Sequence, residues 1–94
     1  MNSWAIGNIY YTVKNGICFV MVDSLLSTTM STANQTILSG LPKPMQDNVW
    51  HSIAANEGAY GSLLVRVTGE NLINHSGSDK ASYFGTFSYP VAES

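Results

Sequence analysis

Apolar and polar positions alternate along much of the chain, which predicts a series of short β-strands. Two β-prone runs, residues 10–14 and 17–22, flank the pair Asn15-Gly16. Asn and Gly tolerate positive φ at both central positions of a tight turn, so this stretch predicts a β-hairpin.

The second strand of this hairpin is apolar on both faces. A strand has a side-chain period of two, which puts Ile17, Phe19 and Met21 on one face and Cys18, Val20 and Val22 on the other. In a small antiparallel sheet one face usually meets water and is polar. We expect the domain to cover one of these faces and another subunit to cover the other.

Two later segments also alternate with a period of two. In residues 62–68, Leu63, Val65 and Val67 are expected to face inward, and Gly69-Glu70 then predicts a hairpin turn. In residues 81–91, Tyr83, Phe87 and Tyr89 share one face, which predicts core packing for these three, whereas Phe84 is on the other face.

The middle of the chain gives weaker signals. Residues 23–36 are rich in Ser, Thr and Asn and predict an extended strand or a loop. Residues 37–44 contain Pro42 and Pro44, which lack backbone donors, so an edge strand or a crossover is expected. Residues 48–56 predict a further strand, with a short helix as the alternative.

Six to eight short strands, with turn signals about every ten residues, are typical of an antiparallel all-β fold. We therefore expect residues 1–94 to form a single small β-sandwich or jelly-roll-like domain.

Composition narrows the function. Only 11% of the 94 residues are charged, against 45% hydrophobic, and the formal net charge is -2. Soluble domains average roughly 25% charged residues, so part of this surface is expected to be hidden in an assembly or built from Ser, Thr and Asn. Four scattered Lys and Arg residues make no basic stripe for nucleic acid. No apolar stretch is long enough for a membrane span.

Few residues suit metal or catalytic chemistry. His51 and His75 have no carboxylate or thiol at ligand spacing, and Cys18 is the single cysteine. The serines include no Gly-x-Ser-x-Gly nucleophile motif, and the six acids mostly fall at turns or termini. We expect no metal, no cofactor and no enzymatic activity.

Aromatic and polar residues near two predicted loops suit saccharide binding. An aromatic face can stack on the C–H side of a pyranose, while amides and charged groups bind its hydroxyls. The first candidate loop set is Trp50, Asn56, Glu57 and Tyr60, and the second is His75, Asp79 and Lys80. Burial in the core is the alternative for Trp50, since large aromatic side chains are mostly buried.

Four short motifs occur in order along most of the chain, at residues 10–17, 39–42, 63–72 and 88–91. The first motif is an aromatic strand followed by a turn and an apolar strand, and the second is Ser-Gly-Leu-Pro. The third consists of two apolar strands around a Gly, and the fourth is Ser-Tyr-Pro-Val. This order resembles the C-terminal receptor-binding head domain of tail-fibre and baseplate proteins from phages and prophages of Gram-positive bacteria. Lys43-Pro44 stands where that family commonly has Arg-Pro, and lysine lacks the fork of donors that arginine offers.

The resemblance implies a β-sandwich head, a homotrimer and attachment to host cell-surface polysaccharide. It implies that residues 1–94 are the C-terminal piece of a longer tail protein, located in the virion tail tip or a prophage-encoded particle beside other tail and baseplate proteins. Two alternatives stay open. One is a structural trimerisation cap of a fibre or baseplate, and the other is a carbohydrate-binding accessory module of a glycoside hydrolase.

Overall fold

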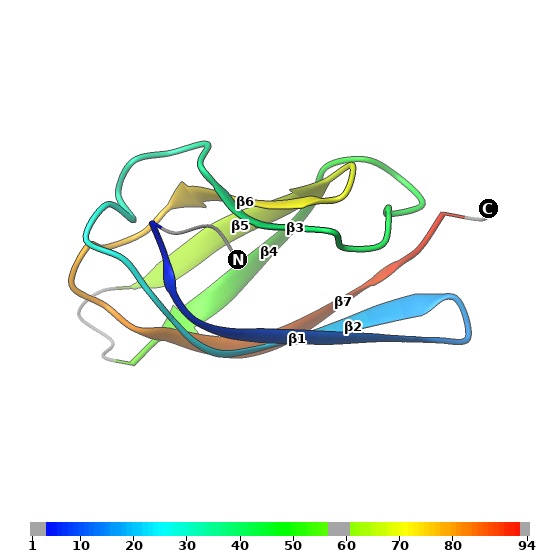
Figure 1. Ribbon diagram of the computed structural model, residues 1–94, viewed down its shortest axis with the longest axis horizontal. Coiled ribbons are helices and arrows are strands. Elements are labelled where there is room, and N and C mark those ends of the chain that lie inside the picture. The colour runs from blue at the N-terminus through cyan, green and yellow to red at the C-terminus, as the bar shows by residue number, and fades with distance from the viewer. Residues whose placement is uncertain (1–3, 57–60, 93–94) are drawn as a thin grey trace.

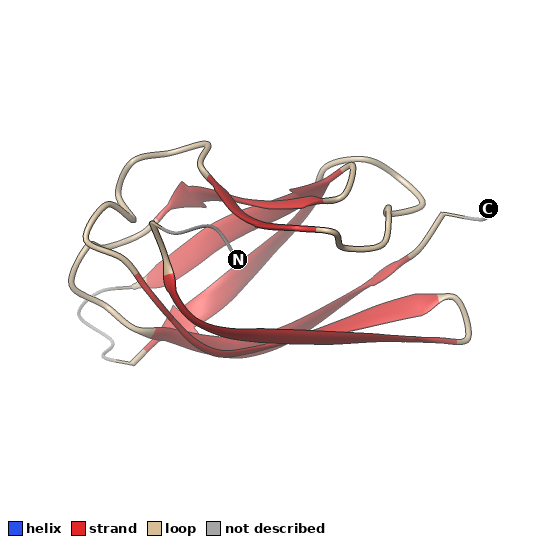
Figure 2. Ribbon diagram, viewed as in Figure 1, coloured by secondary structure: helices blue, strands red, loops and turns tan. Residues whose placement is uncertain are grey.

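All the strands of the domain belong to one antiparallel sheet in the computed structural model, which describes residues 4–56 and 61–92. In this part of the chain there are seven strands and no helix (Figure 2). They are β1 (Ile6–Lys14), β2 (Ile17–Leu26), β3 (Thr36–Ser39), β4 (Val49–Ala55), β5 (Ser62–Thr68), β6 (Asn71–Ser76) and β7 (Tyr83–Pro90). Their order across the sheet is β1-β2-β7-β4-β5-β6-β3 (Figure 1).

The sheet curls into a half-barrel at the junction of β4 and β7. These two strands pair only at Ala54 with Phe84 and at Ala55 with Tyr83, and they diverge from there (Figure 1). One layer therefore contains β1, β2 and β7, and the other contains β3 to β6. The all-β antiparallel fold is confirmed, but the expected pair of separate sheets is replaced by one sheet that folds over on itself.

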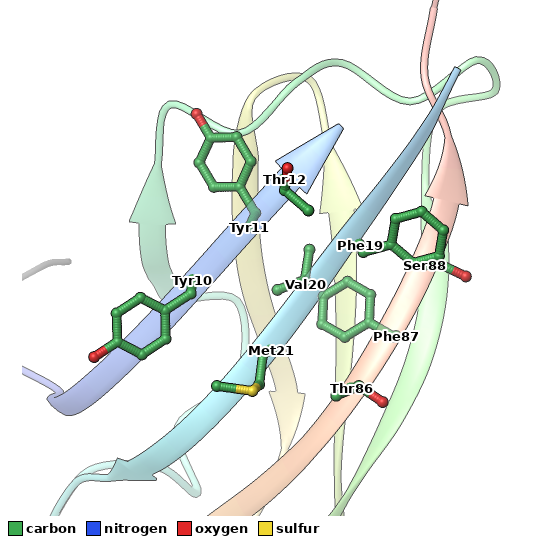
Figure 3. Close-up of a pocket in the computed structure, with 9 residues that line it drawn as sticks. All are labelled: Tyr10, Tyr11, Thr12, Phe19, Val20, Met21, Thr86, Phe87 and Ser88. Carbon is green, nitrogen blue, oxygen red and sulfur yellow. The ribbon is translucent and has the colours of Figure 1, made fainter. Parts of the chain in front are cut away.

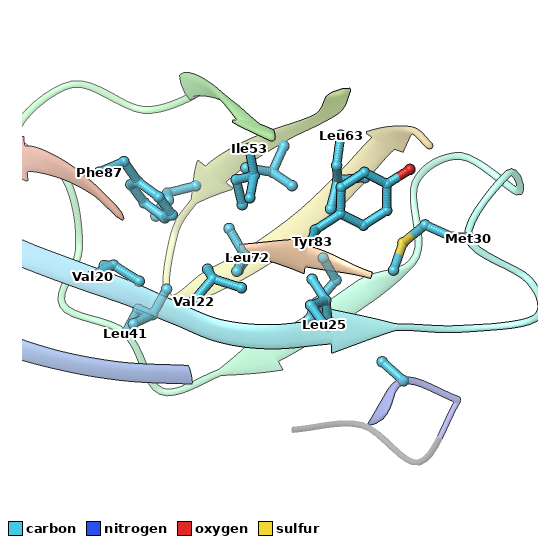
Figure 4. Packing of buried hydrophobic residues seen from close by; sticks show 14 of the residues in the cluster. Val20, Val22, Leu25, Met30, Leu41, Ile53, Leu63, Leu72, Tyr83 and Phe87 are labelled. Carbon is cyan, nitrogen blue, oxygen red and sulfur yellow. The ribbon is translucent and has the colours of Figure 1, made fainter. Parts of the chain in front are cut away.

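The core fills the space between these two layers, as Figure 4 shows. The alternation in three strands is confirmed, because their inward-facing side chains are buried. They are Cys18, Val20 and Val22 in β2, Leu63, Val65 and Val67 in β5, and Tyr83, Phe87 and Tyr89 in β7. Apolar side chains from both layers thus bury one another, which is the main stabilising term for a sheet of this size.

The half-barrel is open between its edge strands, β1 and β3, and side chains span this opening. The indole Nε1 of Trp4 donates to the carbonyl of Thr36 at 2.8 Å, and the Tyr11 hydroxyl donates to the carbonyl of Gly40 at 3.3 Å. The edge position of β3, next to the two prolines, agrees with the prediction for residues 37–44.

The first hairpin is confirmed in detail. Asn15 and Gly16 have φ of 53° and 76°, so both central turn positions are left-handed as the sequence requires. Lys14 pairs with Ile17, and the register then places Thr12 opposite Phe19 and Tyr10 opposite Met21. The second strand continues to Leu26, which settles the first part of residues 23–36 as strand.

Candidate functional site

Trp50 lies on the outer face of the sheet. The side chains of β4 alternate, so that Ile53 is buried in the core while Trp50, Ser52 and Ala54 are exposed. Trp50 keeps 47% of its surface accessible. The alternative that this residue is part of the core is therefore wrong.

Two charged or titratable side chains border the Trp50 ring. Arg66 is opposite Trp50 in the β4–β5 register, and its Cζ lies 5.8 Å from the centroid of the indole ring. The His75 ring meets the indole edge to face, with centroids 5.3 Å apart and an interplanar angle of 87°. A cation at this distance from an indole ring is attracted by its π-electrons.

The register of the sheet explains how these residues come together. The β5–β6 pairing shifts between Leu64 and Val65, and His75 occupies the extra position in β6. Asn48 completes the group, because Arg66 Nη1 donates to its Oδ1 at 2.8 Å. We call Trp50, Arg66, His75 and Asn48 the Trp50 cluster.

The Arg66 guanidinium retains binding capacity. Arginine has five N–H donors, and within residues 4–56 and 61–92 only the contact to Asn48 is a hydrogen bond of this side chain. No carboxylate of the described residues forms an ion pair with it. The cluster therefore combines an exposed aromatic ring with free donors directed to the surface.

Asn56, from the first predicted set, is not beside Trp50. Asn56 follows the opposite end of β4, about 20 Å away at roughly 3.3 Å per residue. Its amide Oδ1 accepts from the Ser82 N–H at 3.2 Å, and its own N–H donates to the Ser82 carbonyl at 2.7 Å. Asn56 thus fastens β4 to the segment before β7. Glu57 and Tyr60 lie outside the described residues.

The second predicted set also divides. His75 is in strand β6, where a turn had been expected, and it contacts Trp50. The Asp79 carboxylate instead accepts from the Ser31 N–H at 2.7 Å and from its hydroxyl at 3.0 Å, which ties two loops together. The exposed Lys80 donates its backbone N–H to the Ser78 hydroxyl at 3.2 Å.

A second surface feature is a groove on the outer face of β1, β2 and β7, shown in Figure 3. Its volume is about 570 Å³. The groove is lined by cross-strand neighbours whose side chains share the outer face, namely Tyr10, Thr12, Phe19, Met21, Thr86 and Ser88. The residues between them in the three strands, Tyr11, Val20 and Phe87, complete the lining. We call it the apolar groove. The alternation in β2 predicted its exposed apolar face but not the cross-strand neighbours of that face.

Two titratable side chains, His51 and Tyr89, pack against the core. His51 stacks on Phe87 with ring centroids 4.6 Å apart, and its buried Nε2 has no hydrogen-bond partner among the described residues. Desolvation lowers the pKa of His51. Burial also raises the pKa of Tyr89, whose hydroxyl donates to the carbonyl of Pro42 at 2.8 Å.

Asp47 is an exposed carboxylate held by two hydrogen bonds near the turn between β5 and β6. The Gly69 N–H at 2.8 Å and the Thr68 hydroxyl at 3.1 Å donate to its Oδ1, and these bonds lower the pKa of Asp47. Within the described ranges no three His, Cys, Asp or Glu residues gather as metal ligands do. The same part of the chain contains no helix long and apolar enough to cross a membrane.

The fold and the two surface features described above come from the structure of this chain alone. Comparison with protein-family models, with curated proteins and with solved structures finds no match for this chain.

Proposed function

We propose that this domain is a non-catalytic receptor-binding head, which attaches the tail of a phage or prophage-encoded particle to a saccharide on the host cell surface. The observation that carries the proposal is the Trp50 cluster. An indole ring that is 47% exposed, with a guanidinium and an imidazole beside it, is a side-chain set that suits a saccharide.

The chemistry of the cluster supports a saccharide over other ligands. The indole offers an apolar face to the C–H groups of a sugar ring, and Arg66 and His75 offer hydrogen-bond partners for hydroxyl or acidic groups. Trp50, Arg66 and His75 lie on strands rather than on long loops, so the sheet holds their geometry. A shallow surface site of this kind is expected to bind each saccharide unit weakly.

Weak sites gain strength when several copies act together. We propose that the head is a homotrimer at the C-terminal end of a tail protein, where it meets other tail and baseplate proteins. Linking equal sites raises the effective concentration of the second and third, and affinity can rise by two orders of magnitude or more. The low charge fraction and the exposed apolar groove support self-association.

The test is binding to an array of bacterial cell-surface polysaccharides, followed by binding to host cells. Wild type is compared with Trp50→Ala and with Phe84→Ala, a control in which the replaced aromatic ring is similarly exposed at 45% but lies on β7. We expect Trp50→Ala to lose at least tenfold in binding while Phe84→Ala keeps wild-type binding. Equal binding by folded Trp50→Ala and wild type would contradict this site.

The apolar groove also favours a second function, that of a structural trimerisation cap in a fibre or baseplate. A cap would be trimeric and would bind no polysaccharide on the array. A monomer that does bind polysaccharide would instead indicate an accessory module of a glycoside hydrolase.

A further inference from the structure

We infer that the apolar groove on β1, β2 and β7 is the surface at which copies of this chain meet. This inference rests on the self-association proposed above and assigns it to particular residues. The second strand has two apolar faces, as its sequence predicted, and the structure shows which one remains uncovered. Val20 and Val22 are buried, whereas Phe19 and Met21 are 48% and 46% exposed.

The distribution of charge suits burial of this face. Lys14 and Asp23 are the only charged residues of the three strands, and they lie at opposite ends of the first hairpin. The stretch between them can be covered without removing a charge from water, which is costly for an unpaired ion. Identical copies also meet there without repulsion between like charges.

The polar groups of the groove are compatible with an identical partner. Thr12, Thr86 and Ser88 border the apolar side chains, and a hydroxyl both donates and accepts hydrogen bonds. Copies of this face that meet around a three-fold axis can therefore satisfy each other, whereas a face of donors alone could not. Interfaces between identical subunits are also more apolar than those between transient partners, which fits a second copy better than a different protein.

The exposed area indicates how far the contact must extend. A fully buried aromatic side chain covers about 150–250 Å², so Tyr10 and Phe19, each about half exposed, contribute about 200 Å² together. A stable interface buries about 800 Å² per partner, so these two rings supply about a quarter of it, and the half-exposed Met21 adds to their share. Tyr11 and Val13 are on the other face of β1, opposite the buried Val20 and Cys18, so the rest of the contact must come from surface beside the groove.

The edge position of β1 provides a further attachment for the neighbouring copy. β1 pairs with β2 on one side and with no strand on the other within the described part of the chain. The free backbone groups of an edge strand are ready partners for another chain. A copy seated on the groove can reach this edge as well.

Sedimentation velocity at micromolar concentration tests the inference with two matched variants. Met21→Glu places a carboxylate in the groove, and Met45→Glu makes the same change at a methionine that is 64% exposed outside it. We expect wild type and Met45→Glu to sediment as trimers and Met21→Glu to fall threefold in mass. Thr12→Arg, opposite Phe19 in the register, is a second variant whose host position is already polar.

Circular dichroism establishes that each variant is folded. The inference is overturned if folded Met21→Glu or Thr12→Arg keeps the wild-type mass, or if wild type is a monomer. A wild-type dimer that Met21→Glu dissociates would support the groove and contradict the threefold order proposed for the head. The saccharide site is tested separately. It is contradicted if Trp50→Ala keeps both the wild-type mass and the wild-type polysaccharide binding.

Discussion

Replacing Asn74 with alanine is expected to lower the free energy of unfolding by about 3 kcal/mol. Asn74 is fully buried in β6, and its side-chain amide holds the loop between β2 and β3. Nδ2 donates to the carbonyls of Met30 at 2.9 Å and Thr32 at 2.8 Å, and Oδ1 accepts from the Gln35 N–H at 2.8 Å.

The magnitude follows from these three bonds. Each net hydrogen bond contributes about 1 kcal/mol, and each buried group left without a partner costs about 1–3 kcal/mol. A domain of this length has a total stability of about 5–14 kcal/mol, so the variant should remain folded at 25 °C. With a urea m-value of about 1.5 kcal/mol per molar, the midpoint should fall by about 2 M.

Urea unfolding, followed by circular dichroism, measures this difference. Asn71→Ala is the control, because it makes the same change in the same strand but removes one exposed bond, from the Ser39 hydroxyl at 3.0 Å. We expect the control to lose less than about 1 kcal/mol. If Asn74→Ala is no less stable than Asn71→Ala, the buried amide does not hold the loop and the reasoning is refuted.

Three further predictions concern His51, Gly7 and Cys18. In the unfolded chain the pKa of His51 is near its usual value of 6.5, whereas burial lowers this pKa in the folded protein. The free energy of unfolding should therefore fall as the pH drops below 6.5. The urea midpoints at pH 7.5 and pH 5.5 should differ less in His51→Gln than in wild type. Gly7→Ala should cost at least about 1–3 kcal/mol in thermal unfolding, because its Cβ would overlap the Ser24 carbonyl at a φ of 145°; an unchanged Tm would contradict this. Cys18 is fully buried and should react with a thiol reagent only after unfolding, so rapid labelling of the native protein would contradict its placement.

Local signals in the sequence predicted the strands well. Asn15-Gly16 has the conformational preference of its turn, and the alternation of Leu63, Val65 and Val67 follows from one strand with one buried face. Such features depend on neighbours in the chain and can be read from composition and spacing alone.

The arrangement of the strands depends on contacts that local patterns do not encode. The sheet is continuous because Ala54 and Ala55 pair with β7, and two alanines at a strand end carry no signal of that pairing. The expected two sheets and the observed single sheet have the same alternation in every strand. Only the long-range register distinguishes them.

Only part of the candidate site could be predicted from the sequence, again because its assembly depends on long-range register. Trp50 and His75 meet because β6 shifts register beside Leu64, an irregularity with no mark in the sequence. Asn56 and Asp79 have the side chains of saccharide-binding residues, but the same groups also accept backbone hydrogen bonds, and here they do so. Residue type alone does not separate these two roles.

The central claim is that the outer face at Trp50 binds a saccharide. Tryptophan fluorescence tests it most directly in a Trp4→Phe background, where Trp50 is the remaining tryptophan. The titrant is the bacterial polysaccharide that gives the strongest array signal. The control is a polysaccharide from the same array that the protein does not bind. The account predicts a saturable change in Trp50 emission with the bound polysaccharide alone. Polysaccharide binding that leaves Trp50 emission unchanged would contradict it.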